Sequence, residues 1–295
     1  MNLQNYNLLK ETKHILRLFN IRPRKSLGQN FVVSRSLISD LINFSSLSSD
    51  DIVLEIGAGI GTLTKALAKV ARKVIAIEID YKLIQILKWR LRNLNNVEII
   101  HADVLSIDFP IVNKVVSNLP FSISSPITFK LIENPKFDLA VLTYQREFAD
   151  RLIAKPGTSN YGRLTVAVNL FAHVEVLKYI SRKCFYPEPE VDIAIVKLIP
   201  KKKKLSSEEI FLLDLIRWLF TQRNKKLRKP LLNYLLNVIG LNDKTCTKIL
   251  NKIPYLEFRV RNLSLNQLLE IAKIILEEGI RIEENFFLRK RLDIT

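Results

Sequence analysis

Four consecutive residues, Asn118, Leu119, Pro120 and Phe121, have the groups that could bind the exocyclic amine of adenine. The Asn118 side-chain oxygen and the Leu119 carbonyl could accept the two amine hydrogens and pull the nitrogen toward a tetrahedral shape, so that its lone pair points at an electrophile. Pro120 would keep the segment rigid, and the Phe121 ring offers a face on which an extruded base can stack. Taken alone, the segment would equally suit an ordinary turn after the apolar residues 114–117.

A glycine-rich turn lies earlier in the chain, between an apolar segment and a helical pattern at residues 63–70. Gly57, Gly59 and Gly61 would let the backbone approach a ligand closely and adopt positive φ. Thr62 stands where the dinucleotide fingerprint has its third glycine. The turn therefore favours a nucleoside cofactor other than NAD.

Two acidic residues end the next two predicted strands. Glu78 follows residues 73–77, and Asp103 follows residues 96–102. The first could accept hydrogen bonds from both ribose hydroxyls of a nucleoside, and the second from the amino group of its adenine. Either acid alone would more simply be a helix cap or a solvated loop charge. The two acids together, at successive strand ends beside the glycine turn, fit S-adenosylmethionine better than NAD. The reactive end of such a cofactor would reach Asn118.

These motifs resemble those of the adenine-N6 RNA methyltransferases, most closely the small-subunit ribosomal RNA adenine-N6,N6-dimethyltransferases. Other matching segments are residues 24–31 (RKSLGQNF), 161–164 (YGRL), 185–192 (FYPEPEVD) and 220–228 (FTQRNKKLR), and residues 137–149 are similar to the archaeal branch. The resemblance implies an α/β, Rossmann-like S-adenosylmethionine-dependent methyltransferase sheet. It also implies transfer of two methyl groups to each of two adjacent adenosines near the 3′ end of small-subunit rRNA, during ribosome biogenesis.

The same resemblance implies roles for individual residues. Those implied to line the methionine end of the cofactor are Gln29, Asn30, Phe31, Gly57, Gly59 and Gly61. Glu78 is implied to hold the ribose and Asp103 the adenine. Asn118 is implied to contact the cofactor as well as the target amine, and Phe121 stands where relatives often have Tyr. Phe185 corresponds to a second aromatic near the target base, although a core aromatic beside a proline turn is an equal alternative.

The charge of the chain favours a polyanionic partner. Lys and Arg number 46 against 29 Asp and Glu, which gives a formal net charge of +17. Arg223, Lys225 and Lys226 lie in a basic cluster that we expect to contact the rRNA backbone. The alternative for this cluster is a solvated surface without a partner.

Other features of the sequence concern the setting of the protein. Cys184 and Cys246 are far apart and form neither a metal motif nor a disulfide framework, so we expect a cytoplasmic protein without a metal. No apolar run reaches the length of a membrane span, and the N-terminus has no signal-peptide core. We expect no membrane association, and a monomer.

The pattern of apolar residues predicts three regions. Residues 1–22 form a helical extension, residues 23–200 alternate strands and helices in a Rossmann-like methyltransferase domain, and residues 201–295 form a small all-α domain. A run of four lysines marks the second boundary. Ser206 with Glu209 and Ser264 with Gln267 predict capping boxes at two helix starts.

Two alternatives to this function remain open. One is a large-subunit rRNA adenine-N6 methyltransferase, which residues 161–164 and 220–228 argue against. The other is a non-catalytic RNA-binding assembly or transcription factor with the same fold. The intact set of Glu78, Asp103 and residues 118–121 argues for catalysis, because a binding module needs none of them.

Overall fold

The computed structural model describes residues 7–133 and 135–278. The chain divides into two compact units, one comprising Met1–Ala149 with Ala172–Lys201 and the other comprising Asp150–Phe171 with Lys202–Thr295. The division differs from the predicted boundary at residue 200, since Asp150–Phe171 groups with the helical unit. The physical reason is packing: helix α7 (Arg163–Phe171) buries its apolar residues beside helix α8 (Ser207–Leu219).

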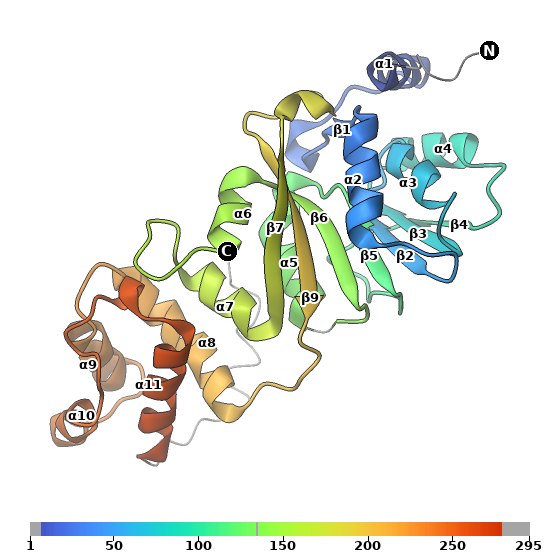
Figure 1. Ribbon diagram of the computed structural model, residues 1–295. Coiled ribbons are helices and arrows are strands. Elements are labelled where there is room, and N and C mark those ends of the chain that lie inside the picture. Colours follow the sequence, from blue (N-terminus) through green and yellow to red (C-terminus); the bar gives the residue numbers. More distant parts are fainter. Residues whose placement is uncertain (1–6, 134, 279–295) are drawn as a thin grey trace. The chain divides into compact units, whose positions relative to one another are not determined.

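The first unit is built on a seven-stranded sheet (Figure 1). Its strands, in spatial order, are β4 (Val97–His101), β3 (Lys73–Glu78), β2 (Ile52–Ile56), β5 (Lys114–Ser117), β6 (Leu139–Gln145), β9 (Ile193–Pro200) and β7 (Ala172–Ile180). The first five are parallel, whereas β9 runs antiparallel to both β6 and β7. The strand order reverses direction between β2 and β5, and such a switch point is where open α/β sheets bind ligands, outside the carboxyl ends of the strands.

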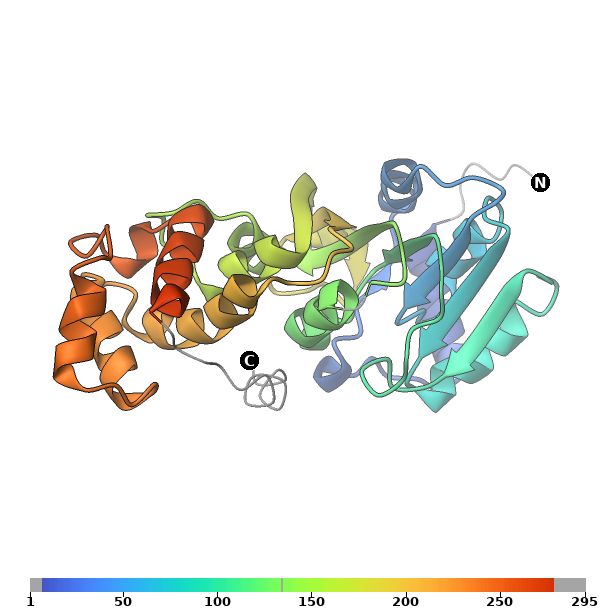
Figure 2. The same ribbon diagram turned by 90° about the horizontal axis from the view of Figure 1, so that it is seen from below.

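Helices cover both sides of this sheet (Figure 2). Those of the first unit are α1 (Leu8–Leu18), α2 (Arg35–Ser45), α3 (Thr62–Leu67), α4 (Tyr81–Arg90) and α5 (Ser124–Glu133), whereas α6 (Arg146–Leu152) spans the division after Ala149. Because both faces are covered, the central strands are almost continuously apolar, and Val53, Ile56 and Val115 are fully buried. Local caps set two helix starts: the Ser34 side chain accepts from the N–H of Leu37 at the start of α2, and Asp80 accepts from Lys82 at the start of α4.

The predicted N-terminal helix exists as α1, and residues 1–6 of that prediction lie outside the described residues. Its buried residues Ile15 and Leu16 pack with Ile60 of the glycine turn and Leu83 of α4. The extension therefore belongs to the same packed unit as the sheet.

A second, two-stranded sheet joins two of the segments that carry the family resemblance. Strand β1 (Phe31–Val32) pairs antiparallel with β8 (Phe185–Tyr186), with Phe31 opposite Tyr186. The short helices η2 (Lys25–Leu27) and η4 (Arg182–Cys184) precede these strands. Segments far apart in the sequence are thus held side by side at the edge of the site described below.

The second unit is helical. Besides α7 and α8 it contains η5 (Phe220–Gln222), α9 (Arg228–Asn237), α10 (Asp243–Leu250), η6 (Val260–Asn262) and α11 (Leu265–Glu277). Both predicted capping boxes are confirmed, at Ser206 with Glu209 and at Ser264 with Gln267. Helices α8 and α11 pack together through buried apolar stripes, which supply the core of this unit.

Candidate active site

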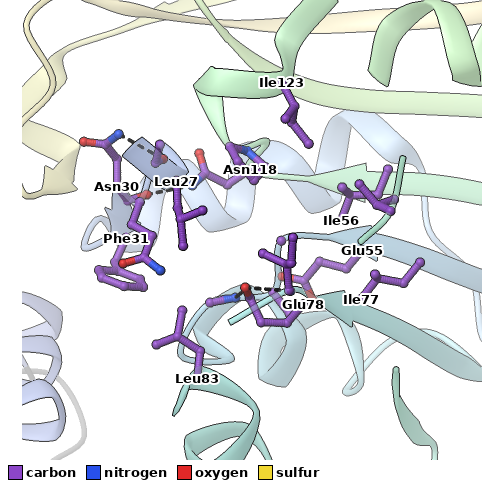
Figure 3. Close-up of a pocket in the computed structure, with 18 of the residues that line it drawn as sticks. Leu27, Asn30, Phe31, Glu55, Ile56, Ile77, Glu78, Leu83, Asn118 and Ile123 are labelled. Carbon is purple, nitrogen blue, oxygen red and sulfur yellow. Dashed lines mark hydrogen bonds between the residues drawn. The ribbon is translucent and has the colours of Figure 1, made fainter. Parts of the chain in front are cut away.

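A cavity opens at the carboxyl ends of β2, β3, β4 and β5, at the switch point between β2 and β5 (Figure 3). Its lining comes from β1 and the loop before it, the end of β2 with the glycine turn, the ends of β3 and β4, Leu83 of α4, and the residues after β5. The predicted site residues in this lining are Gln29, Asn30, Phe31, Gly57, Gly59, Glu78, Asp103, Asn118 and Pro120. The structure therefore brings most of the predicted set around one cavity.

The glycine turn fits closely between two neighbours. Gly57 and Gly59 have φ of +72° and +60°, in the left-handed region that side chains disfavour. A Cβ added to Gly57 would lie 2.7 Å from Cγ of Pro120, and one added to Gly59 would lie 3.2 Å from the Phe31 ring. Glycine is required at both positions because the turn contacts Pro120 on one side and Phe31 of β1 on the other. Pro120 belongs to residues 118–121, which are called the catalytic segment below. Gly61, with φ +79°, forms the cap of α3.

Glu78 ends β3 and is buried. Its Oε2 accepts from the Gly59 N–H at 2.8 Å, and its Oε1 accepts from the N–H groups of Ile79 and Asp80, both at 2.9 Å. Burial raises the pKa of this carboxyl, whereas the N–H donors lower it. Because a carboxylate has roughly four acceptor positions, three bonds leave room for a ribose hydroxyl.

Asp103 follows β4 and is exposed on the cavity side of the sheet. Its Oδ1 accepts from the Leu105 N–H at 2.9 Å, and the Ser106 hydroxyl donates to its Oδ2 at 3.3 Å. The carboxylate thus caps its own turn while facing the cavity, which is the arrangement expected of an acceptor for an adenine amino group.

Lys130 of α5 holds the same turn from the other side. Its ammonium donates to the carbonyls of Val104 and Leu105 at 2.8 Å and of Ile107 at 2.5 Å, and lies 5.1 Å from the centroid of the Phe109 ring. Burial lowers the pKa of this lysine. This role could not be predicted from the sequence, because a lysine on an amphipathic helix is ordinarily a solvated surface residue.

Asn118 is fixed at both ends of its carboxamide. Its Nδ2 donates to the Asn30 carbonyl at 2.8 Å, and the Thr143 hydroxyl donates to its Oδ1 at 2.7 Å. The Asn30 side chain in turn donates to the Gly28 carbonyl at 3.2 Å. Figure 3 shows Asn30, Asn118 and Glu78 around the same cavity. The loop before β1 therefore positions the predicted catalytic residue.

The remainder of the catalytic segment begins a short helix, η3 (Phe121–Ile123). The Leu119 side chain is buried, so only its carbonyl is a candidate acceptor. The half-buried Phe121 ring lies 6.4 Å from that of Phe185, centroid to centroid, with an angle of 68° between the planes. Phe185 is only 3% exposed, which favours the second of the two predicted roles: a core aromatic, here supporting Phe121 from behind.

Gln29 makes contacts that the sequence did not indicate. Its Nε2 donates to Oδ2 of Asp80 at 3.0 Å, and its Oε1 accepts from the Arg24 N–H at 2.8 Å. Arg24 also forms an ion pair with Asp80 at 3.8 Å. Gln29 thus ties the loop before β1 to the start of α4, as well as lining the cavity.

The predicted basic cluster lies in the helical unit, and its members differ. Arg223 donates to the carbonyls of Tyr161 at 3.1 Å and Ser159 at 2.9 Å, so its guanidinium holds the loop before α7. Lys226 is exposed and pairs with Glu257 at 2.6 Å. Lys225 is exposed. The predicted phosphate contacts of the three remain a prediction, and Lys225 is the cleanest residue on which to test them.

Glu55 also lines the cavity, although no role was predicted for it from the sequence. Glu55 of β2 is 2% exposed, and its Oε2 has no hydrogen-bond partner among the described residues. Burial raises the pKa of this carboxyl to about 8, and the nearby charge of Glu78 adds to the shift. The signal was present in the sequence, since an acid inside an otherwise apolar strand needs a reason.

These features fit a bound nucleoside cofactor. The glycine turn offers a close-fitting backbone, and the ends of two strands offer the acidic side chains of Glu78 and Asp103 to the cavity. A profile of the family described as ribosomal RNA adenine dimethylase matches residues 20–276. The chain belongs to this family. The predicted resemblance is confirmed, and the protein is an S-adenosylmethionine-dependent methyltransferase with a Rossmann-like sheet.

Individual members of the ribosomal RNA adenine dimethylase family are similar over most of their length. The chain is 44% identical over 270 residues to the probable ribosomal RNA small subunit methyltransferase A of Methanothermobacter thermautotrophicus, which covers 91% of this chain and 96% of that protein. It is 42% identical over 271 residues to the protein of the same name from Pyrococcus furiosus, covering 90% and 97%. These archaeal relatives agree with the predicted archaeal-like branch.

Two solved structures have similar folds. A dimethyladenosine transferase from Plasmodium falciparum gives a TM-score of 0.76 at 35% identity, covering 85% of this chain and 98% of that one. The 23S rRNA methyltransferase ErmE gives a TM-score of 0.63 at 27% identity, covering 83% and 99%.

Among the described residues, helices lack the length and apolar character needed to cross a membrane. Within the same residues, His, Cys, Asp and Glu side chains form no group of three or more that could hold a metal ion.

Proposed function

We propose that this protein dimethylates the N6 amines of two adjacent adenosines near the 3′ end of small-subunit rRNA during ribosome assembly. The observation that carries the proposal is the fixed carboxamide of Asn118 at the end of β5, beside a cavity with acidic edges for a nucleoside. The names and identities of the small-subunit relatives support the choice of subunit.

The cofactor supplies an electrophilic methyl group when bound, and the residues of this chain hold and orient the reactants. The glycine turn would line the methionine end of the cofactor and Glu78 would hold its ribose, while Asp103 would accept from the adenine amino group. The Asn118 Oδ1 and the Leu119 carbonyl would accept the hydrogens of the target amine. These acceptors matter most as the nitrogen gains positive charge, because they are already oriented and need no reorganisation.

Phe121 would stack on the extruded base, with its ring supported edge-on by Phe185. Exposed basic residues of the helical unit, Lys225 first among them, would contact phosphates. We further propose that the protein acts as a cytoplasmic monomer and needs no metal. Its two cysteines, both free thiols in the structure, are compatible with a reducing compartment.

The direct test is transfer of radiolabelled methyl groups onto undermethylated small and large ribosomal subunits, with the modified bases mapped. Label on two adjacent adenosines of the small-subunit rRNA is expected, and Asn118→Ala should abolish most of it. Label confined to the large subunit would instead support the activity named for ErmE, whose fold is also similar. Binding to the small subunit without methyl transfer would indicate a non-catalytic assembly factor.

A further inference from the structure

Strand register places Thr143 beside Asn118. Strands β5 and β6 are parallel, and the last pair in their ladder is Ser117 opposite Leu142. One residue further along each strand are Asn118 and Thr143, whose side chains meet in a hydrogen bond of 2.7 Å from the hydroxyl to Oδ1. Because Thr143 is fully buried, its hydroxyl, which donates to Asn118, does not reach solvent.

The two partners of the Asn118 carboxamide determine which end is oxygen. A carboxamide has two N–H donors and two acceptor positions on its oxygen. The Asn30 carbonyl can only accept, so it selects the nitrogen, and the Thr143 hydroxyl donates to the oxygen. Turning the amide by 180° would set Oδ1 against the Asn30 carbonyl oxygen, which is repulsive. One acceptor position on Oδ1 is left for the target amine.

We propose that Thr143 is a positioning residue for methyl transfer, which acts by fixing the rotation of the Asn118 carboxamide. The inference rests on the proposed function of Asn118 and extends it to a residue that touches neither reactant. With Asn30 as its only partner, the carboxamide would be held at its nitrogen alone, and its oxygen could rotate about that one hydrogen bond. Thr143 adds the second fixed point, and it does so from a central strand that is held on both sides by β5 and β9.

The consequence is a specific division of kinetic effects. Thr143→Val keeps the shape and burial of the side chain but removes the hydroxyl donor. Its kcat should fall by about 10- to 100-fold, since a misplacement of about 1 Å in a reacting geometry can cost about 10²-fold. The affinity for S-adenosylmethionine should stay within about twofold of the parent, because the bonds made by Glu78 and Asp103 are untouched. Thr143→Ser should recover most of the lost turnover.

A matched control is available on α5. Thr128 is also fully buried, and its hydroxyl lies 2.7 Å from the hydroxyl of Tyr144. Tyr144 directly follows Thr143 in the chain. Thr128→Val also removes a fully buried hydroxyl, which here contacts the Ser124 carbonyl and the Tyr144 hydroxyl, but it leaves both contacts of the Asn118 carboxamide in place. It should lower the thermal midpoint to an extent similar to Thr143→Val while leaving kcat near the parental value.

A second readout does not depend on activity. Side-chain amide resonances of Asn118, assigned by comparison with Asn118→Ala, should shift and broaden in Thr143→Val and remain unchanged in Thr128→Val. Parental kcat in a folded Thr143→Val, with unshifted Asn118 resonances, would overturn the inference. If the parent enzyme methylates neither subunit, the proposed function has failed, and the amide resonances still report whether Thr143 orients Asn118.

Discussion

The main-chain N–H of Gly59 donates to Oε2 of Glu78 at 2.8 Å, so the acid that ends β3 also holds the glycine turn after β2. The sequence predicted a ribose contact for Glu78 but not this bond, nor those from Ile79 and Asp80. A substitution of Glu78 should therefore combine two effects: a lost cofactor contact and a loosened turn. Asp103 is exposed and should show the first effect without the second.

The first prediction compares Glu78→Ala with Asp103→Asn. Loss of a bond to a charged group costs roughly 1.5–3 kcal/mol, so each variant should bind S-adenosylmethionine about 10- to 100-fold more weakly. Glu78→Ala should also lower the thermal midpoint, because the N–H groups of Gly59, Ile79 and Asp80 lose their acceptor. Calorimetry and thermal melts measure the two effects separately.

Asp103→Asn is the sharper variant, because its Oδ1 can still accept from Leu105, while an amide nitrogen replaces Oδ2 and presents a donor to the adenine amino group; the Ser106 hydroxyl can rotate to accept from that nitrogen. Its thermal midpoint should match the parent. Parental cofactor affinity in both variants would remove the assignment of these acids to the cofactor.

The second prediction concerns pH and Glu55. Its pKa is near 4.5 in the unfolded chain and is raised by burial to about 8 in the folded chain. Between these values the folded chain binds the extra proton, so the free energy of unfolding should fall as pH rises from 5 to 8. The slope contributed by this group is at most about 1.4 kcal/mol per pH unit. Urea unfolding at several pH values measures it.

Glu55→Gln is the control for this effect, because a carboxamide does not titrate. Its stability should change less steeply than the parent over the same pH range. Equal slopes in the two proteins would mean that Glu55 is ionised in the folded chain at neutral pH.

The residues around the cavity could be predicted largely because the chemistry is carried by strand ends. Gly57, Glu78, Asp103 and Asn118 each follow an apolar segment, and the carboxyl ends of parallel strands meet at one edge of a sheet. Sequence order alone therefore gathers them. The Rossmann-like sheet and the two capping boxes follow from equally local patterns.

The supporting contacts could not be predicted, because they depend on register and on packing between distant segments. Thr143 reaches Asn118 only because β5 and β6 are aligned with Ser117 opposite Leu142. Lys130 of α5 reaches the turn after β4, more than twenty residues earlier in the chain. Likewise, the grouping of Asp150–Phe171 with the helical unit depends on which apolar faces meet, which periodicity within one helix does not encode.

The third prediction separates structure from RNA binding in the basic cluster. Arg223→Met should lower the stability of the helical unit by roughly 1–3 kcal/mol, since it removes the donors to Ser159 and Tyr161. Lys225→Ala should leave stability unchanged. It should reduce the slope of log affinity against log salt by about 0.7–0.9 if it contacts one phosphate. Filter binding to small subunits at several salt concentrations measures this slope.

Lys244→Ala on α10 is the matched control, since Lys244 is another exposed lysine of the same unit. Its salt slope should equal that of the parent. A Lys225 variant that also keeps the parental slope would show that this lysine is only a solvated surface charge.

The fourth prediction concerns the turn that contains Asp103. Lys130→Met removes three hydrogen bonds to that turn while keeping the length of the side chain. The looser turn should weaken S-adenosylmethionine binding by up to about tenfold, equivalent to ~1.4 kcal/mol. Calorimetry with Lys88→Met, an exposed lysine of α4, serves as the comparison. Equal affinities in the two variants would mean that Lys130 supports only the fold.

The last prediction separates the roles of Asn118 and Phe121. Asn118→Ala removes a preoriented acceptor and should lower turnover by about 10²–10³-fold. Phe121→Ala removes a stacking face worth about 1–3 kcal/mol per base, whereas Phe121→Tyr keeps that face and should retain most activity. A monomethylated amine has one hydrogen left for the two acceptors, so the second transfer depends more on the stacked ring.

Phe121→Ala should therefore accumulate N6-monomethyladenosine relative to the dimethylated product. Mass spectrometry of digested rRNA after single-turnover and long incubations gives the ratio, with Phe121→Tyr as the matched control. Both variants keep Phe185 and differ only in the side chain at position 121, so a difference between them reports on the Phe121 ring itself. A parental rate and product ratio in Phe121→Ala would mean that the ring does not touch the target base, and parental turnover in Asn118→Ala would overturn the mechanism.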